Sequence, residues 1–250
     1  NYTDTGSGPV VVLLHGYMAS SQYWERLATR LSKTNRVIAL DLLGFGGSPK
    51  PVTSRYDYDT QLRSIDATLR YLGVRGKFSL VGHSMGSLLA LRFASVYPER
   101  VRKLTLSNMP IFLSRREAKR DIMGGNLLYQ IGLRRGLHDI IWPILSLALR
   151  FRLIPLKIAG ETATRKSFIF QNTSSSRLRS MRNVIFAVGI EADLLRIDMK
   201  TTLITGLQDR KQYLLNLPKL RQAKNIVSHV VQGGHHTPLT HPELLQQFVV

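Results

Sequence analysis

A serine stands between two glycines in the segment Gly82-His83-Ser84-Met85-Gly86, directly after an apolar run and before a helical pattern. A serine hydroxyl becomes a nucleophile when a base takes its proton and N–H groups stabilise the oxyanion that forms. A sharp turn from a strand into a helix exposes the hydroxyl, and the flanking glycines allow close backbone packing. This context favours a nucleophile over an incidental serine in a glycine-rich turn. We therefore predict Ser84 as the nucleophile and the N–H of Met85, at the helix start, as an oxyanion donor.

A second oxyanion donor is expected in the loop His15-Gly16-Tyr17-Met18, which ends the apolar run 10–14. A loop at this point can turn a backbone N–H toward the serine, and we assign this role to Tyr17. His15 follows the run directly, which favours a structural role in the loop over the role of catalytic base. We expect the same of His83, whose side chain should leave its turn on the side opposite Ser84.

A carboxylate follows another apolar run in the segment 203–210, Leu-Ile-Thr-Gly-Leu-Gln-Asp-Arg. Asp209 would lie at the carboxyl end of a strand, where ligands of parallel sheets bind, and could there orient a histidine and stabilise its imidazolium. A local turn made by Asp209 is the simpler alternative. Asp193 and Asp198 precede the strand, so they should lie at its opposite end. We predict Asp209 as the acid.

Two histidines follow a glycine pair at 233–236, between the last apolar run and the last helical pattern. The glycines allow the chain to bend back over the sheet, and histidine suits proton transfer near neutral pH. We predict His235 as the base, with His236 as the second choice. Neighbouring histidines rarely bind one ion together, and no ligand cluster accompanies them in the sequence, so we expect no metal site and no cofactor.

The elements that must position these residues alternate along the chain. Nearly continuous apolar runs are typical of strands buried on both faces of a parallel sheet, and they lie at 10–14, 37–42, 78–81, 104–106, 202–205 and 226–231. Helical patterns lie at 22–31, 58–72, 85–97 and 242–250. We predict an α/β fold, a mostly parallel sheet flanked by helices. Because Ser84, Asp209 and His235 each follow a strand, they should meet at one edge of the sheet.

The segment 110–185 interrupts this alternation. It shows no evident strand, and its fourteen Lys and Arg face four Asp and Glu, so it carries +10 of the formal net charge of +19. We predict a helical insertion, which divides the chain into a core (1–109), an insertion (110–185) and the rest of the core (186–250). The scattered charges favour a solvated surface, with peripheral contact to an anionic membrane as the alternative. Nucleic-acid binding is not expected, because no recognisable module accompanies the charge.

Composition narrows the class of protein further. The 250 residues include no cysteine, which excludes disulfide scaffolds, thiolate metal sites and a cysteine nucleophile. The longest apolar stretch, 140–149, is half as long as a membrane span, which needs about 20 residues. The start of the chain shows no basic and then apolar leader. We expect a cytoplasmic protein that contacts membranes at most peripherally.

Several motifs together resemble the α/β-hydrolase superfamily, with a likeness that covers 1–109 and 186–250. Besides the serine turn and the His-Gly-Tyr-Met loop, they are Asp-Leu-Leu-Gly-Phe-Gly-Gly-Ser at 41–48, Tyr-Pro-Glu-Arg-Val at 97–101 and Gly-Gly-His-His-Thr-Pro-Leu-Thr-His-Pro-Glu at 233–243. The chain order serine, acid, histidine is also the order of this superfamily. The resemblance implies that Asp41 is structural and that 110–185 is a cap over the substrate pocket. Candidate lining residues in this cap are Leu128, Ile131, Trp142 and Phe168.

The resemblance implies a serine hydrolase that cleaves carboxylic esters of apolar small molecules or lipids through an acyl-enzyme. Ser84 argues against haloalkane dehalogenases and epoxide hydrolases, whose nucleophile is aspartate. Some members place the acid one strand after the nucleophile, where this chain has Asn108; an amide cannot stabilise an imidazolium, so Asp209 is favoured.

Other activities on the same three residues stay open. Carbon–carbon bond hydrolases are disfavoured, because the loop 17–20 lacks the glycine and proline usual in them. Cofactor-free haloperoxidases cannot be separated by these motifs. A ligand-binding receptor with vestigial hydrolysis and a lipid enzyme acting at a membrane surface are the remaining alternatives.

Overall fold

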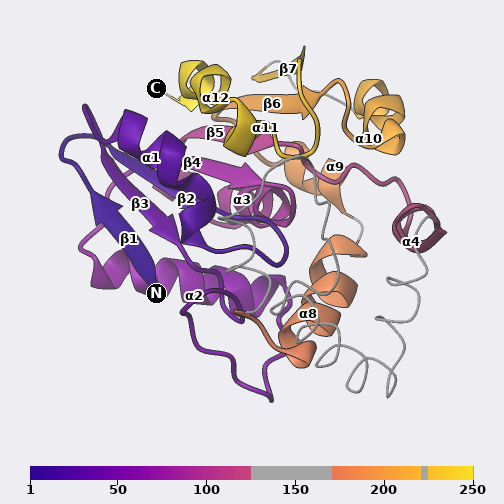
Figure 1. Cartoon of the computed structure of the whole chain (residues 1–250), viewed down its shortest axis with the longest axis horizontal. Helices are drawn as coiled ribbons and strands as arrows, with labels where there is room; N and C mark the ends of the chain where they lie inside the picture. Colours follow the sequence, from indigo (N-terminus) through magenta and orange to yellow (C-terminus); the bar gives the residue numbers. More distant parts are fainter. Residues whose placement is uncertain (125–170, 188, 221–224, 250) are drawn as a thin grey trace, which may run out of the picture.

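The computed structural model describes residues 1–124, 171–187, 189–220 and 225–249 (Figure 1). Within these residues, seven strands form one sheet in the order β1-β3-β2-β4-β5-β6-β7. All neighbouring pairs are parallel except β1 with β3, which is antiparallel at one edge. The strands are β1 (Tyr2–Thr5), β2 (Val10–Leu14), β3 (Arg36–Leu40), β4 (Phe78–His83), β5 (Val101–Ser107), β6 (Lys200–Gly206) and β7 (Ile226–Val231).

The centre of the sheet is buried on both faces. Alternate residues of β2 enter different apolar clusters, with Val12 and Leu14 on one side and Val11 and Leu13 on the other. None of these four side chains is more than 1% exposed. Burial on both sides explains why this strand shows a continuous apolar run in the sequence rather than an alternation.

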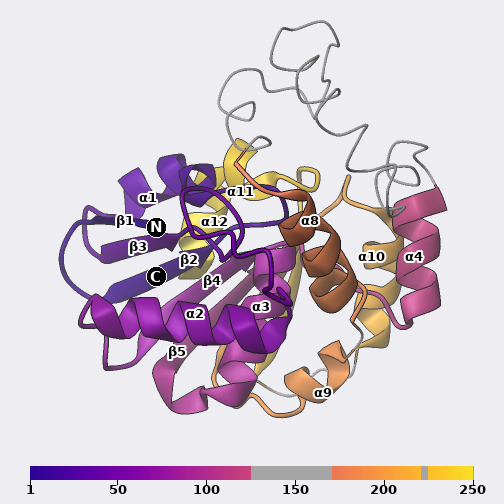
Figure 2. The ribbon, with the colours of Figure 1, turned by 90° about the horizontal axis from the view of Figure 1, so that it is seen from below.

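Helices cover the two faces. The helices α2 (Tyr58–Tyr71) and α3 (Met85–Val96) contribute to the larger apolar cluster, whereas α1 (Glu25–Leu31) and α12 (Pro242–Val249) contribute to the smaller one. Figure 2 shows α2 and α1 on opposite sides of the strands. The predicted fold class, a mostly parallel sheet flanked by helices, is confirmed.

The predicted bounds differ from the structure where the chain is exposed or irregular. No strand is predicted at 2–5, because this antiparallel edge strand has all four residues exposed and lacks an apolar pattern. The helix predicted at 22–31 is divided into a 3₁₀ turn (Ser21–Trp24) and α1. Strand β5 begins three residues before the predicted 104–106 run, where Arg102 and Lys103 hide the pattern.

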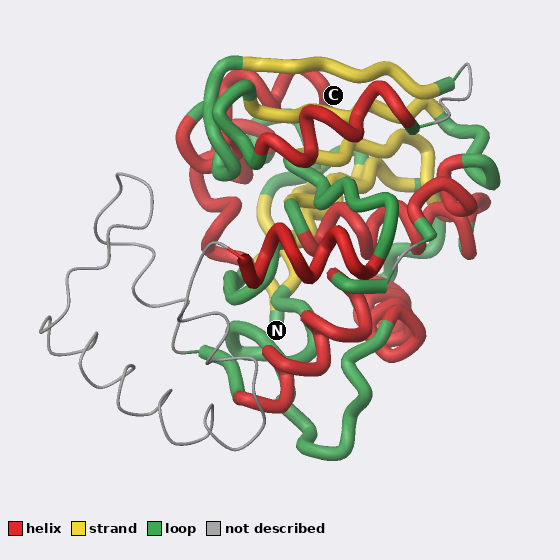
Figure 3. The backbone as a smooth tube through the Cα atoms, turned by 90° about the vertical axis from the view of Figure 1, so that its right-hand side faces the viewer, coloured by secondary structure: helices red, strands yellow, loops and turns green. Residues whose placement is uncertain are grey.

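Most of the described residues in the segment 110–185 are helical. They comprise α4 (Arg115–Gly124) and α8 (Ser174–Ser180), which a π-helical turn (Met181–Ile185) continues. The other short helices are α9 (Ile190–Leu194), α10 (Lys211–Asn216) and α11 (Thr237–Thr240), with 3₁₀ turns at Pro98–Arg100 and Leu217–Lys219. Figure 3 shows the strands in yellow with red helices around them. The three-part division of the chain stays a prediction, because 125–170 lies outside the described residues.

Candidate active site

Ser84 occupies the sharp turn between β4 and α3. Its backbone has φ +52° and ψ −119°, a conformation that residues with a side chain rarely adopt. Two backbone hydrogen bonds hold the turn: the Ser84 N–H donates to the Ser107 carbonyl at 3.0 Å, and the Ser84 carbonyl accepts from the Ser87 N–H at 2.9 Å. The turn therefore fixes the hydroxyl at the carboxyl edge of the sheet, beside β5.

The two glycines that flank Ser84 are required by close backbone contacts. A β-carbon on Gly82 would lie 2.4 Å from the Gly86 carbonyl oxygen. A β-carbon on Gly86 would lie 2.2 Å from the Leu14 carbonyl oxygen. Both contacts are with backbone atoms, which a side-chain rotation cannot relieve. The Gly-x-Ser-x-Gly spacing is thus the steric condition for this turn.

His235 lies within hydrogen-bond distance of both Ser84 and Asp209. Its Nε2 is 2.9 Å from Ser84 Oγ, and its Nδ1 is 2.9 Å from Asp209 Oδ1. An acceptor as strong as a carboxylate selects the tautomer in which Nδ1–H donates to Asp209, which leaves Nε2 to accept from the serine hydroxyl. The His235 side chain is 30% exposed, while the Asp209 side chain is fully buried. Three residues that are far apart in the sequence therefore form one continuous hydrogen-bonded chain.

The Asp209 carboxylate is buried but well supplied with donors. Burial raises the pKa of Asp209, and hydrogen bonds from His235, from the Asn108 amide and from the Arg210 N–H more than reverse this effect, so its pKa lies below the ordinary value. The Arg210 N–H is 2.7 Å from Oδ1. Asp209 is therefore ionised at neutral pH and accepts hydrogen bonds only.

Asn108 connects the acid to the histidine loop, a role that no motif in the sequence indicates. Its amide nitrogen donates to Asp209 Oδ2 at 2.8 Å and to the Gly234 carbonyl at 3.1 Å. The residue is completely buried at the end of β5 and has φ +51°. The sequence did place Asn108 after the strand next to the nucleophile, but not the partners of its amide.

A close contact between two loops brings His235 over the sheet. A β-carbon on Gly206, at the end of β6, would lie 2.4 Å from the Gly233 carbonyl oxygen. The Gln208 N–H donates to the same carbonyl at 2.9 Å. The loop that carries Asp209 is thereby joined to the loop that carries His235.

His15 and His83, two further histidines near this edge, hold loops together. His15 is fully buried; its Nδ1–H donates to the Gly16 carbonyl at 2.7 Å and its Nε2 accepts the Leu42 N–H at 3.0 Å. His83 Nε2 lies 2.7 Å from the His235 carbonyl oxygen, and its ring stacks on Tyr23 with 4.6 Å between centroids. Burial lowers the pKa of His15 to about 4. Burial, and then the neighbouring His235 ring, lowers the pKa of His83 well below its ordinary value.

The loop after β2 lies directly against Ser84. A β-carbon on Gly16 would lie 3.2 Å from Ser84 Cβ, so the absence of a side chain lets the following peptide, that of Tyr17, approach the nucleophile. The Tyr17 hydroxyl donates to the Arg177 carbonyl of α8 at 3.3 Å. Met85 is the first residue of α3, where a backbone N–H has no acceptor within the helix. Tyr17 and Met85 therefore both lie close to Ser84. Their role as oxyanion donors stays a prediction.

Asp41 makes only structural contacts. Its carboxylate accepts from the Asn1 side chain at 2.7 Å, the Ser21 N–H at 2.6 Å and the Gly47 N–H at 2.7 Å. Burial raises the pKa of Asp41, but these hydrogen bonds leave it below its ordinary value. The carboxylate therefore organises the loop after β3.

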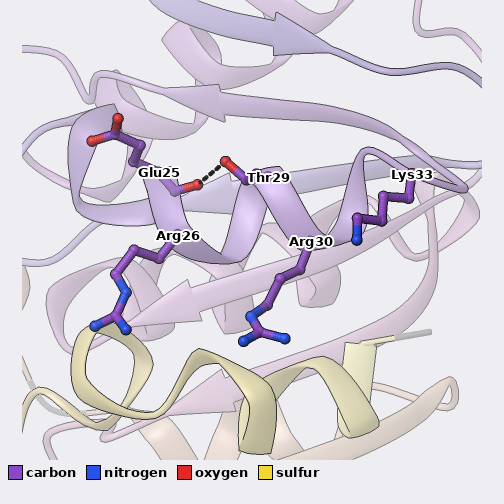
Figure 4. A pocket seen from close by; sticks show the side chains of 5 residues that line it. All are labelled: Glu25, Arg26, Thr29, Arg30 and Lys33. Atoms are coloured by element: carbon purple, nitrogen blue, oxygen red, sulfur yellow. Dashed lines mark hydrogen bonds between the residues drawn. The ribbon is translucent and has the colours of Figure 1, made fainter.

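Other candidate sites do not include Ser84 or lie outside the described residues. Leu128, Ile131, Trp142 and Phe168, the predicted pocket lining, belong to 125–170 and are not described. Among the described residues, no three His, Asp or Glu side chains are grouped so that they could hold a metal ion. A surface depression along α1 is lined by one carboxylate, one hydroxyl and three cations: Glu25, Arg26, Thr29, Arg30 and Lys33 (Figure 4). The Arg26 guanidinium there donates to the Leu239 carbonyl of α11 at 3.1 Å.

Comparison with known proteins gives a match over part of the chain. Residues 9–124, which include the serine turn, match the family model described as alpha/beta hydrolase fold. The chain therefore has the α/β-hydrolase fold. The serine turn, the parallel sheet and the order of Ser84, Asp209 and His235 along the chain agree with that fold.

Proteins similar to this chain differ in the reactions that their names state. It is 35% identical over 114 residues, 45% of this chain and 36% of the relative, to a cis-3-alkyl-4-alkyloxetan-2-one decarboxylase of Shewanella oneidensis. It is 35% identical over 138 residues, 54% of this chain and 30% of the relative, to the probable lysophospholipase BODYGUARD 4 of Arabidopsis thaliana. The matches thus span about a third of the length of these two relatives.

A solved structure described as a membrane phospholipase A, a bacterial virulence factor, superposes on 98% of this chain and 79% of its own with a TM-score of 0.72. At 24% sequence identity this likeness shows the fold alone.

Proposed function

We propose that this α/β-hydrolase cleaves carboxylic esters of apolar small molecules or lipids, with Ser84, His235 and Asp209 as its catalytic residues. The observation that carries the proposal is the pair of 2.9 Å distances from His235, one to the serine hydroxyl and one to the buried carboxylate. Nucleophile, base and orienting acid are the three parts that acyl transfer needs.

The first half of the reaction forms an acyl-enzyme. Ser84 Oγ attacks the ester carbonyl carbon while its proton passes to His235 Nε2. Asp209 stabilises the imidazolium that results, and the Tyr17 and Met85 N–H groups stabilise the oxyanion. The carbon–oxygen bond to the alcohol then breaks, and the Nε2 proton passes to the departing alkoxide.

The second half releases the acid. His235 Nε2 takes a proton from water as the hydroxide oxygen attacks the acyl carbon, and a second tetrahedral oxyanion forms. The bond from that carbon to Ser84 Oγ then breaks, and Nε2 returns the proton to the serine. The carboxylic acid leaves and the free enzyme is restored.

An apolar substrate is supported by what surrounds His235. The Tyr213 ring lies 6.1 Å from the His235 ring and contacts Phe112 edge-on with 5.2 Å between centroids. Tyr213 and Phe112 are both buried, so the base is flanked by aromatic surface. The relative named a probable lysophospholipase and the structure described as a phospholipase A add lipid esters to the substrates considered.

A panel of esters tests the proposal. It contains p-nitrophenyl esters of graded acyl length, lactones, monoacylglycerols and lysophospholipids; a cyclic ester is included because one relative is named for an oxetan-2-one. We expect turnover by the purified chain and a loss on the order of a thousandfold or more in Ser84→Ala. Turnover that is unchanged in Ser84→Ala would refute the assignment. No turnover of any ester by the folded wild-type chain would favour the alternative that the chain is a ligand-binding receptor.

A peripheral contact with anionic membrane is the second part of the proposal. No helix in the described part of the chain is long and apolar enough to cross a bilayer. The formal net charge of +19 favours association with the surface of an anionic membrane.

A further inference from the structure

The outward face of α4 carries four cations in one stripe. Arg115, Arg116, Lys119 and Arg120, which we call the basic face of α4, are all exposed. Their spacing places Arg115 above Lys119 and Arg116 above Arg120, four residues apart on the helix surface. An adjoining side of the helix buries Ala118 and Ile122 in the core. Like charges at this spacing repel each other, so the stripe weakens the helix that carries it.

The two acids of α4 do not neutralise this stripe, because both are turned toward α10. Glu117 accepts hydrogen bonds from Gln212 at 2.6 Å and from Asn216 at 3.1 Å. Asp121 forms an ion pair with Arg210 at 3.1 Å. Within the described residues, no ion pair reaches any cation of the basic face. The helix thus separates its charges, with the acids inward and the cations outward.

Two exposed leucines lie near α4. Leu113 lies two residues before α4 and is 40% exposed, and its N–H donates to Glu117 at 2.7 Å. Leu215 on α10, next to Asn216, is 51% exposed. Cations with neighbouring exposed apolar side chains are the combination that binds an anionic membrane surface, because headgroups attract the charges and the apolar groups enter the acyl boundary.

The surface lies at the same edge of the sheet as the candidate active site. The chain runs from Asn108, which contacts Asp209, directly into the segment that begins α4. Figure 2 shows α4 and α10 together at the end of the molecule where α8 lies. A bilayer bound there would meet the edge at which the nucleophile is presented.

We propose that the basic face of α4, together with the nearby exposed Leu113 and Leu215, docks this α/β-hydrolase onto anionic lipid bilayers. The inference rests on the proposed function, because it explains how an enzyme for apolar esters meets substrate at a lipid surface. The leucines favour a bilayer over a nucleic acid, whose phosphate backbone gives them no apolar partner.

Vesicle binding by charge-matched variants tests this proposal. One variant carries Arg115→Gln, Arg116→Gln, Lys119→Gln and Arg120→Gln. The control carries Arg30→Gln, Lys33→Gln, Arg75→Gln and Lys77→Gln, four exposed cations near the amino ends of strands, at the opposite edge of the sheet. Each variant lowers the formal net charge from +19 by the same amount. The probe is co-sedimentation with phosphatidylcholine vesicles with and without one-quarter phosphatidylglycerol.

We expect the wild-type chain to bind only the vesicles that contain phosphatidylglycerol and to be released near 1 M salt, where the screening length falls to about 3 Å. The α4 variant should bind them at least about tenfold more weakly, while the control keeps most of the affinity. Equal losses in the two variants, binding that ignores lipid charge, or retention of RNA in place of vesicles would each overturn the proposal.

Ester turnover separates this result from the proposed function. Both variants should hydrolyse a water-soluble p-nitrophenyl ester at the wild-type rate, since neither changes the residues around Ser84. Only the α4 variant should lose turnover of the same acyl group presented in anionic vesicles. Failure of soluble turnover in the wild-type chain contradicts the active-site assignment, whereas soluble turnover without charge-dependent binding contradicts the docking surface alone.

Discussion

The amide of Asn108 binds the carboxylate of Asp209, with 2.8 Å between Nδ2 and Oδ2, on the side opposite His235. The same amide binds the Gly234 carbonyl, next to His235 in the chain. One buried side chain therefore sets the position of both the acid and the loop that carries the base.

Replacing Asn108 tests this positioning role. In Asn108→Ala both hydrogen bonds are lost, so we expect kcat for an ester to fall about tenfold or more with little change in KM, because ordering of the base matters most in the transition state. Removing a donor also raises the pKa of Asp209, which makes its carboxylate a stronger acceptor for the proton of the His235 imidazolium, so the acid limb of the pH–rate profile should move to higher pH. A merely structural residue would lower stability without moving that limb. Asn108→Gln serves as the conservative comparison.

Glycine at position 86 is predicted to be irreplaceable for steric reasons. Gly86→Ala places a β-carbon 2.2 Å from a backbone oxygen of β2, so we expect the free energy of unfolding to fall by at least about 2 kcal/mol. Gly76→Ala is the matched control, because nothing lies within 4 Å of its β-carbon position. Urea unfolding of both variants measures the difference. Equal stabilities would show that the turn tolerates a side chain.

Stability should fall as the solution is acidified from pH 7.5 to 5. His15 is neutral in the folded chain, where its pKa is about 4, but takes up a proton near 6.5 when unfolded. The unfolded state therefore binds more protons over this range, which lowers the free energy of unfolding by about 2 kcal/mol for His15 alone. His83, whose pKa is also lowered by burial, acts in the same direction.

Urea unfolding at the two pH values measures this effect. His15→Gln should be less stable than wild type at pH 7.5 yet lose less stability on acidification. The carboxylates do not interfere, since the lowered pKa values of Asp41 and Asp209 place their loss of stability below about pH 4. Identical wild-type stability at pH 5 and 7.5 would contradict the buried neutral histidines.

The sheet was largely predictable because a strand that is buried on both faces has a nearly continuous apolar run in the sequence. Strand β2 was predicted at the residues where it lies, since each of its side chains has an apolar neighbour on one side or the other. Strand β1 was not predicted, because its residues are exposed; it is held by backbone pairing with β3 and by the ion pair of Asp4 with Arg36 at 2.7 Å. Backbone hydrogen bonds carry no residue preference of their own, so an exposed edge strand cannot be recognised from the pattern of apolar residues in the sequence.

The residues of the candidate site were predicted from their positions at strand ends, but the side chains that hold them in place were not. Ser84, Asp209 and His235 each follow an apolar run, and parallel strands end at one edge. The role of Asn108 depends on a contact over 101 residues of chain, between side chains that no spacing rule connects. The hydrogen bond between the His83 ring and the His235 carbonyl could not be predicted from the sequence for the same reason.

The central claim is that Ser84 is a nucleophile activated by His235. The most direct measurement is intact-mass and peptide mass spectrometry after treatment with an alkyl fluorophosphonate. We predict one phosphonyl adduct on Ser84 of the wild-type chain, none in Ser84→Ala, and labelling of His235→Ala slowed on the order of a thousandfold. An adduct elsewhere, or equally fast labelling of Ser84 without His235, would contradict the account.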